Sequence, residues 1–255
     1  MSEKSHASLV RDQFSPQAAA YVTSAVHAEG EDLEALASLI AGHGKARALD
    51  LGCGGGHVSF RVAPHVGQVT AYDLSESMLA AVAKAAGERG LKNIVTRQGS
   101  VERLPFDDGS FDFVLSRYSA HHWHGFPAAL REARRVLKPA GRAVFMDAIS
   151  PGPTLLDTYL QTVEMLRDPS HFRDYSLAEW VGAVTAAGFA PSAIIQRRVR
   201  LEFTSWIQRM RTPEVRVKAI RSLQAEMSGD VVRHFAIEAD GSFMLDTMSL
   251  EAVPV

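Results

Sequence analysis

Cysteine is almost absent from this chain, because Cys53 is the only one among 255 residues. No disulfide can therefore form within the chain. Long apolar runs are missing too, since no segment approaches the roughly 18 apolar residues of a membrane-spanning helix. The first residues, MSEKSHASLVRDQF, lack the apolar core of a signal peptide. These absences predict a cytoplasmic protein that does not insert into a membrane.

An excess of charge of one sign is also missing. The chain has 27 basic and 29 acidic residues and a net charge of −2, so it has no overall positive field to attract a nucleic-acid backbone. Hydrophobic residues make up 46% and charged residues 22%, as in an ordinary globular protein. A chain of 255 residues lies near the upper limit for one hydrophobic core. We therefore expect a single domain over residues 1–255.

Short apolar segments alternate with segments of helical spacing. The expected strands are 46–51, 68–73, 93–98, 111–116 and 142–147, with later ones near 193–201 and 242–250. The expected helices are 57–64, 75–90, 126–137, 154–166, 176–187 and 212–227, and a turn is expected at 138–141. Strands that alternate with helices predict a parallel sheet.

A glycine-rich turn follows the first expected strand, in the string Asp50-Leu51-Gly52-Cys53-Gly54-Gly55-Gly56. Alternating glycines allow positive φ angles and let a ligand lie against the backbone. The plainer alternative is a tight connection between a strand and a helix. The spacing is not G-x-G-x-x-G and no lysine follows, which disfavours dinucleotide and triphosphate binding.

Asp73 ends the next expected strand. A carboxylate at this place can accept hydrogen bonds from both hydroxyls of a ribose. Together, the turn and Asp73 predict a cofactor that contains adenosine and no phosphate.

Four strings occur in a characteristic order: ALDLGCGGGHVS, AYDLSESML, LPFDDGSFDFVLSRYSAHHW and LREARRVLKPAGR. In these strings the chain resembles the class I S-adenosylmethionine-dependent methyltransferases of the UbiE-like, type 11 group. The resemblance implies a Rossmann-like, mostly parallel sheet of seven strands in the order 3-2-1-4-5-7-6, with the last strand antiparallel and helices on both faces. It implies S-adenosylmethionine as cofactor, S-adenosylhomocysteine as product, and a small-molecule acceptor. It divides the domain into cap helices (1–45), a cofactor-binding core (46–150) and a substrate side (151–255) with a lid insertion at about 203–235.

The resemblance also implies roles for individual residues at the cofactor. Gly52, Cys53 and Gly54 would pack under its methionine part, Asp50 would anchor the turn, and Asp73 would hold the ribose. Ser100 occupies the place where related enzymes commonly have an acid for the adenine amino group, and its hydroxyl, the Val101 N–H or Glu102 could substitute. The other predicted cofactor residues are Leu74, Met78, Ser116 and Tyr21, of which Met78 and Tyr21 could equally be packing residues.

A histidine cluster follows the fourth expected strand, in the string Tyr118-Ser119-Ala120-His121-His122-Trp123-His124. An imidazole titrates near neutrality and can take a proton from an acceptor hydroxyl, amine or acidic carbon. We predict His122 as the base, with His121 and Tyr118 as further catalytic candidates; the alternative is that the histidines cap a helix or bond buried carbonyls. His-His-x-His without acids at ligand spacing is a poor metal pattern, so no metal is expected.

Arg117, Trp123 and Arg209 are the predicted acceptor-binding residues. The lid insertion is basic and follows three further arginines, which suggests an acceptor with a carboxylate or phosphate; a solvated helix face would explain the same charges. The basic residues are Arg197, Arg198, Arg200, Arg209, Arg211, Arg216, Lys218 and Arg221.

Three other functions are open at this point. The protein could bind S-adenosylmethionine or S-adenosylhomocysteine as a catalytically silent regulator, but the intact motifs and the histidines favour an enzyme. A nicotinamide dehydrogenase is disfavoured by the glycine spacing. Methylation of RNA or DNA is disfavoured because the chain has no aromatic and basic platform and no Asn/Asp-Pro-Pro-Tyr/Phe signature.

Overall fold

Seven strands form one sheet in the order β3-β2-β1-β4-β5-β7-β6. The computed structural model describes residues 5–18 and 30–255. β1 to β5 run parallel, and β7 is antiparallel to both β5 and β6, so the predicted strand order and the antiparallel last strand are confirmed. The strands are β1 (Arg47–Leu51), β2 (Gln68–Asp73), β3 (Ile94–Gln98), β4 (Phe111–Arg117), β5 (Leu137–Ala148), β6 (Phe189–Leu201) and β7 (Phe243–Pro254).

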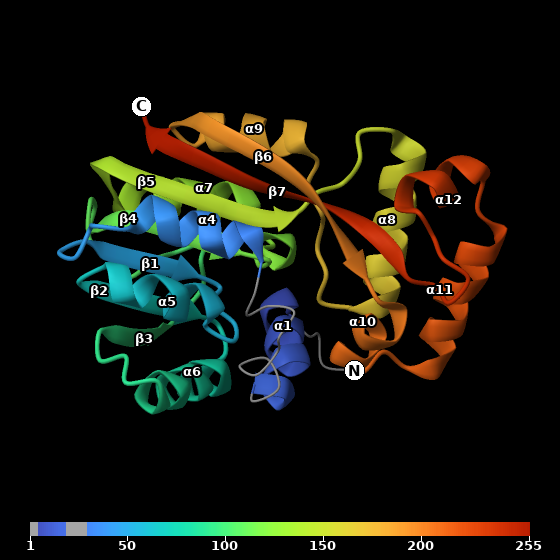
Figure 1. The fold of residues 1–255 in the computed structure, drawn as a ribbon, viewed down its shortest axis with the longest axis horizontal. Coiled ribbons are helices and arrows are strands. Elements are labelled where there is room, and N and C mark those ends of the chain that lie inside the picture. The colour runs from blue at the N-terminus through green and yellow to red at the C-terminus, as the bar shows by residue number, and fades with distance from the viewer. Residues whose placement is uncertain (1–4, 19–29) are drawn as a thin grey trace.

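Helices cover both faces of the sheet, and further helices lie beyond one end of it (Figure 1). They are α1 (His6–Phe14), α4 (Glu31–Ile40), α5 (His57–Val62), α6 (Glu76–Glu88), α7 (Phe126–Val136), α8 (Thr154–Arg167), α9 (Leu177–Ala186), α10 (Phe203–Arg209), α11 (Glu214–Glu226) and α12 (Gly229–Phe235). Three short 3-10 helices add η1 (Ser15–Gln17), η2 (Ala63–His65) and η3 (Ala120–His122).

Alternating strand residues supply the two cores of the sheet. Ala48 of β1 packs with apolar residues of α4 and α5, whereas its neighbour Leu49 packs with those of α7 and α9 on the opposite face. This alternation follows from the pleat, which points successive side chains to opposite faces. Because both faces are covered, the central strands are almost wholly buried, as is usual for parallel sheets.

The segment between β6 and β7 forms α10, α11 and α12, which pack on α8 around a third core. Trp206, Ile220 and Phe235 are fully buried in this core. Figure 1 shows these four helices gathered at one end of the sheet, with α1 between them and the β1–β3 half. The insertion is thus a packed helical unit, and its role as a lid stays a prediction, as does the division of the chain into cap, core and substrate side.

The turn expected at 138–141 lies inside a strand instead. β5 runs without interruption from Leu137 to Ala148, and Phe111 pairs with Leu137 while Phe113 pairs with Arg142. The intervening residues form a bulge, which the lysine, proline and glycine at this place accommodate. None of the helices formed by the described residues is long and apolar enough to cross a bilayer.

Candidate active site

A cavity lies at the carboxyl ends of β1, β2, β4 and β5, where open parallel sheets bind their ligands. Two groups of residues form most of its walls, and residues of α1, β6 and β7 complete the lining. One group comes from the turns after β1, β2 and β3, and the other from η3, the end of α8, the following loop and α10. We call these the cofactor half and the acceptor half of the cavity.

The glycine turn after β1 forms the floor of the cofactor half. Gly52 and Gly54 have φ angles of 63° and 48°, which other residues rarely adopt. A Cβ on Gly52 would lie 1.8 Å from Oγ of Ser119, whereas one on Gly54 would meet nothing within 4 Å. The chain therefore needs glycine at position 52 for its own packing, and position 54 leaves open space in which a ligand can lie against the backbone.

Asp50 is buried beneath this turn, as the anchoring prediction requires. Its Oδ2 accepts hydrogen bonds from the backbone N–H and the hydroxyl of Ser59, at 3.1 and 2.7 Å. Burial raises the pKa of Asp50 to about 7, against the effect of these two bonds. The carboxyl group thus ties the end of β1 to the first turn of α5.

Asp73 stands at the end of β2 and faces the same space. Its Oδ2 accepts from the backbone N–H of Gly54 at 2.9 Å, and its Oδ1 accepts from that of Ser75 at 2.9 Å. Burial raises its pKa, although these bonds act in the opposite direction. A carboxylate oxygen can accept more than one bond, so both oxygens can also receive the hydroxyls of a ribose.

The remaining predicted cofactor residues fall into two sets. Leu74, Met78 and Val101 line the cavity with Cys53. Ser100 and Ser116 do not: Ser100 donates to Glu102 at 3.2 Å, and Ser116 is buried with no hydrogen-bond partner for its hydroxyl among the described residues. Tyr21 lies outside the described residues.

The histidine cluster forms the tight turn η3 at the boundary between the two halves. Tyr118, which precedes it, has a φ of 49°, a strained value for a residue with a side chain. Asp147, at the end of β5, accepts from the backbone N–H of Ala120 at 2.8 Å and bonds Nδ1 of His121 at 2.6 Å. Burial opposes a charge on His121, but the charge and hydrogen bond of Asp147 prevail and raise the pKa of His121 to about 9. His121 is therefore held as an imidazolium.

His122, in contrast to His121, is uncharged. Its Nδ1 lies 3.0 Å from the carbonyl oxygen of Ser170, which can only accept, so Nδ1 carries the proton and Nε2 is an acceptor. Burial, and next the charge of His121, lower the pKa of His122 to about 4. His122 is consequently neutral at neutral pH, and it lines the cavity.

The three predicted acceptor-binding residues also line the cavity. Arg117 forms a two-point ion pair with Asp32 of α4, at 2.5 and 3.2 Å, and Trp123 donates its indole N–H to Ser119 at 3.0 Å. Arg209 reaches the cavity from the end of α10.

The other basic residues of the insertion and its approach do not line the cavity. Arg198 and Arg200 of β6 pair with Asp246 and Glu238. Arg197 bonds Ser249 and lies 3.5 Å from Glu31, and Lys218 of α11 pairs with Glu214 in solvent. Four of the eight basic residues that suggested an acidic acceptor thus form ion pairs outside the cavity.

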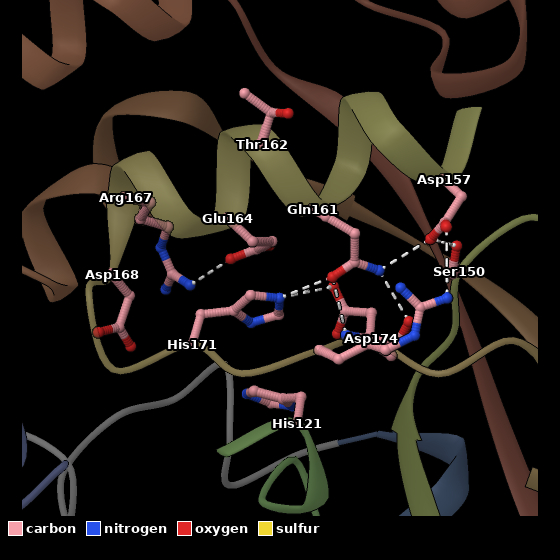
Figure 2. A network of polar contacts seen from close by, with 12 residues as sticks. His121, Ser150, Asp157, Gln161, Thr162, Glu164, Arg167, Asp168, His171 and Asp174 are labelled. Atoms are coloured by element: carbon pink, nitrogen blue, oxygen red, sulfur yellow. Dashed lines mark hydrogen bonds and ion pairs between the residues drawn. The ribbon is translucent and has the colours of Figure 1, made fainter. Parts of the chain in front are cut away.

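Buried ionisable side chains from α8 and the loop after it complete the acceptor half. Gln161 fixes the loop, because its Oε1 accepts from the N–H of Asp174 and from His171, while its Nε2 donates to the carbonyl oxygen of Asp174 (Figure 2). Glu164, Arg167, Asp168 and Asp174 line the cavity. Burial raises the pKa of Asp174 to about 8, and its Oδ2 has no hydrogen-bond partner among the residues that the structure describes.

Sequence reasoning missed these acids and Asp147. For Asp147 a signal was present, because it ends a buried strand as Asp50 and Asp73 do. For Asp168 and Asp174 the only hint was the charged string RDPSHFRD after an apolar helix, which reads equally well as a solvated loop. No group of three or more His, Cys, Asp or Glu within the described ranges could hold a metal ion.

The strand order, the glycine floor and Asp73 at the end of β2 define a class I methyltransferase with a site suited to S-adenosylmethionine. Residues 49–145 match the family model of a methyltransferase domain. YafE of Escherichia coli (strain K12) is 51% identical over 197 residues, which cover 77% of this chain and 95% of YafE. YcgJ of Bacillus subtilis (strain 168), an uncharacterised methyltransferase, is 37% identical over 207 residues, covering 81% and 82%.

The crystal structure of YcgJ superposes with a TM-score of 0.84 at 32% identity and covers 88% of this chain and 97% of its own. A putative methyltransferase from Bacillus halodurans C-125 gives the same score at 29% identity, covering 88% and 98%. The chain belongs to the type 11 S-adenosylmethionine-dependent methyltransferases. It is an enzyme that takes a methyl group from S-adenosylmethionine and transfers it to a small molecule.

Proposed function

We propose that the acceptor is a small molecule with an acidic group, that it binds in the acceptor half of the cavity, and that His122 takes the proton released by its reacting atom. The observation that carries this proposal is the tautomer of His122. Its Nδ1 donates to Ser170, so the nitrogen that remains, Nε2, can accept a proton from a bound molecule.

The cofactor half fits S-adenosylmethionine by its own geometry. The open backbone at Gly54 would hold the methionine part, Asp73 the ribose, and Met78 would pack on the adenine. When bound, the cofactor supplies an electrophilic methyl group on a sulfonium. Because the leaving sulfur departs neutral, the protein mainly has to position the acceptor and exclude water.

His122 suits a base because it is neutral and held in place. The carbonyl of Ser170 fixes one ring nitrogen, and Phe14 of α1 lies edge-on to the ring with a centroid distance of 5.0 Å. His121 lies beside it, with ring centroids 4.3 Å apart. The positive charge of His121 keeps His122 unprotonated, so that Nε2 of His122 stays available as an acceptor.

Tyr118 would serve as a hydrogen-bond donor. Burial raises its pKa to about 12, so its hydroxyl keeps its proton throughout the physiological range. The side chain lines the cavity next to His121 and His122. A neutral phenol at this place can orient an oxygen or nitrogen of the acceptor.

Arg209 is the residue we assign to the acidic group. It is the predicted acceptor-binding arginine of the helical insertion, and it lines the cavity beside Trp206 and Met210. Arg167 lines the same wall, where its guanidinium binds Glu164 at 3.1 Å and the carbonyl oxygen of Trp206 at 3.0 Å. The planar guanidinium of an arginine matches the geometry of a carboxylate or phosphate.

The test is His122→Gln, with His124→Gln as the matched control, because His124 belongs to the same cluster, is exposed and does not line the cavity. A screen with radiolabelled S-adenosylmethionine against small metabolites first supplies an acceptor. We expect His122→Gln to lower kcat about 100-fold or more, with cofactor affinity by calorimetry within about threefold of wild type. Equal losses in kcat and cofactor affinity would give His122 a structural role.

A further inference from the structure

We propose that Asp168 and His122 together form a subsite for an amino group, and that the nitrogen bound there is the methyl acceptor. This inference rests on the function proposed above, and it adds the chemical class of the reacting atom. The inference is based on two hydrogen-bond acceptors in the cavity wall, Oδ2 of Asp168 and Nε2 of His122. They lie 4.0 Å apart, and no described residue donates a hydrogen bond to either of them.

Asp168 follows the last residue of α8 and is 2% exposed. Its Oδ1 accepts from the backbone N–H and the hydroxyl of Ser170, at 2.8 and 2.7 Å. Its Oδ2 points toward His122, and within residues 5–18 and 30–255 no arginine or lysine forms an ion pair with it. Burying a carboxylate without a cation costs free energy of folding. A ligand with a positive charge or a hydrogen-bond donor would therefore bind favourably at this oxygen.

Nε2 of His122 lies 4.0 Å from that oxygen. The distance is too long for a hydrogen bond, and neither atom has a hydrogen to give, since the proton of His122 is on Nδ1. Neither atom can therefore supply the hydrogen bond that the other could accept. A group that donates twice from one atom can serve both, because two N–H bonds of one nitrogen reach acceptors about 3 Å away.

The surroundings favour an amine over a hydroxyl. A hydroxyl has one hydrogen and can serve only one of the two acceptors. The positive charge of Arg167 on the same wall is engaged by Glu164, and that of His121 is engaged by Asp147. An ammonium group would add the missing positive charge beside Asp168.

The transfer balances with the groups present. An ammonium that enters the site first releases one proton to solvent. The neutral amine then donates its two N–H bonds to Oδ2 of Asp168 and Nε2 of His122, which leaves its lone pair for the methyl group. The nitrogen–carbon bond forms as the carbon–sulfur bond breaks with its electron pair going to sulfur, and the products are a methylammonium and S-adenosylhomocysteine. Asp168 then faces the positive charge of the methylammonium and stabilises it, while Nε2 of His122 accepts its second hydrogen bond. With Arg209 on the same cavity wall, the preferred acceptor carries an amino group and an acidic group together.

Three probes of similar shape test the subsite while the acceptor itself is still unidentified: 2-phenylethylamine, 2-phenylethanol and 3-phenylpropanoate. Each is titrated by calorimetry into wild-type enzyme saturated with S-adenosylhomocysteine. We expect the amine to bind about tenfold or more tightly than the alcohol, as a charge-assisted hydrogen bond should give. An amine that binds no better than the alcohol, or not at all, would overturn the proposal.

Asp168→Asn keeps the oxygen that Ser170 bonds and replaces the other, and Asp230→Asn, on the exposed face of α12, is the control. We expect the first variant to lose the amine preference and the second to keep it. The ¹⁵N signal of Nε2 in His122 should move when the amine binds to wild type and stay unmoved with Asp168→Asn. Failure of the proposed function would show differently, as a loss of S-adenosylhomocysteine binding or as unaltered turnover in His122→Gln.

Discussion

The two halves of the cavity are built in different ways. The cofactor half comes from one continuous stretch, residues 50–101, and presents mostly backbone groups, glycines and the carboxyl groups of Asp50 and Asp73. The acceptor half joins η3, the end of α8, its following loop and α10, and presents buried ionisable side chains. The contrast teaches that recognition of a shared cofactor can be read from one motif, whereas recognition of an individual acceptor depends on segments far apart in the chain.

The halves also differ in what they contribute to stability. In the cofactor half, the polar groups of Asp50 and Asp73 are bonded to the chain's own N–H groups. In the acceptor half, Asp174 has a buried oxygen that no described residue bonds, and burial lowers the pKa of His171 to about 2. Groups that are buried without full compensation destabilise the fold, which is the pattern expected of a site kept for function.

The largest effect should follow Asp73→Ala, which removes the carboxylate that we assign to the ribose. The variant loses the ribose contacts and the bond to the N–H of Gly54 that shapes the turn. Two charge-assisted bonds correspond to a loss of about 100-fold or more in affinity for S-adenosylmethionine, measured by calorimetry. Asp112→Ala, which removes a surface ion pair with Lys138, should bind normally, and near-normal binding by Asp73→Ala would disprove the ribose assignment.

The sequence predicted most of the residues that line the cofactor half for a physical reason, and their contacts with the cofactor stay predictions. A tight turn after a buried strand requires glycine, and a ribose requires an acid at the end of the next strand, so both needs are met by residue types at fixed positions. The strand order was predicted from the family resemblance, and the structure confirms it. Prediction from local pattern was less successful elsewhere. It failed at 138–141, where Lys-Pro-Ala-Gly is typical of a turn but forms a bulge because Phe113 of β4 pairs with Arg142.

The acceptor half could be predicted only in part. His121 and His122 were found because they follow a strand closely. That His121 is charged and His122 neutral depends on Asp147 and on the carbonyl of Ser170, which no local sequence pattern links to them. For the basic helix α11 the sequence left two interpretations open, for a related reason. Periodicity shows that a helix has a charged face, but whether that face meets the cavity or solvent depends on how α11 packs on α8.

A smaller effect, of opposite sign, should follow Asp174→Asn. Because the folded-state pKa of Asp174 is raised to about 8, the wild type loses stability as the pH rises from about 4, where the unfolded carboxyl ionises, to about 8. An amide does not titrate, so the variant should be more stable than wild type at pH 7 by about 1–3 kcal/mol.

Urea unfolding at pH 4, 5.5 and 7 measures this difference, which should shrink toward zero at pH 4. Asp107→Asn, at an exposed carboxyl between β3 and β4 and outside the cavity, should show no such growth with pH. A stability difference that is the same at all three pH values would mean that Asp174 is ionised in the folded protein. The claim that the acceptor half destabilises the fold through Asp174 would then be wrong.

The smallest effect should follow Lys218→Ala on α11. Lys218 pairs with Glu214 at 3.5 Å, and both side chains are about three-quarters exposed, at 76% and 75%. Such pairs contribute no more than about 0.5 kcal/mol, so urea unfolding, turnover and binding of the 3-phenylpropanoate probe should all remain close to wild type. Arg209→Ala is the comparison, and it should weaken that carboxylate by about tenfold because its guanidinium lines the cavity. If instead Lys218→Ala weakens the carboxylate and Arg209→Ala does not, the basic face of α11 must close over the bound acceptor, and the acceptor half would extend to a helix that lies outside it in this structure.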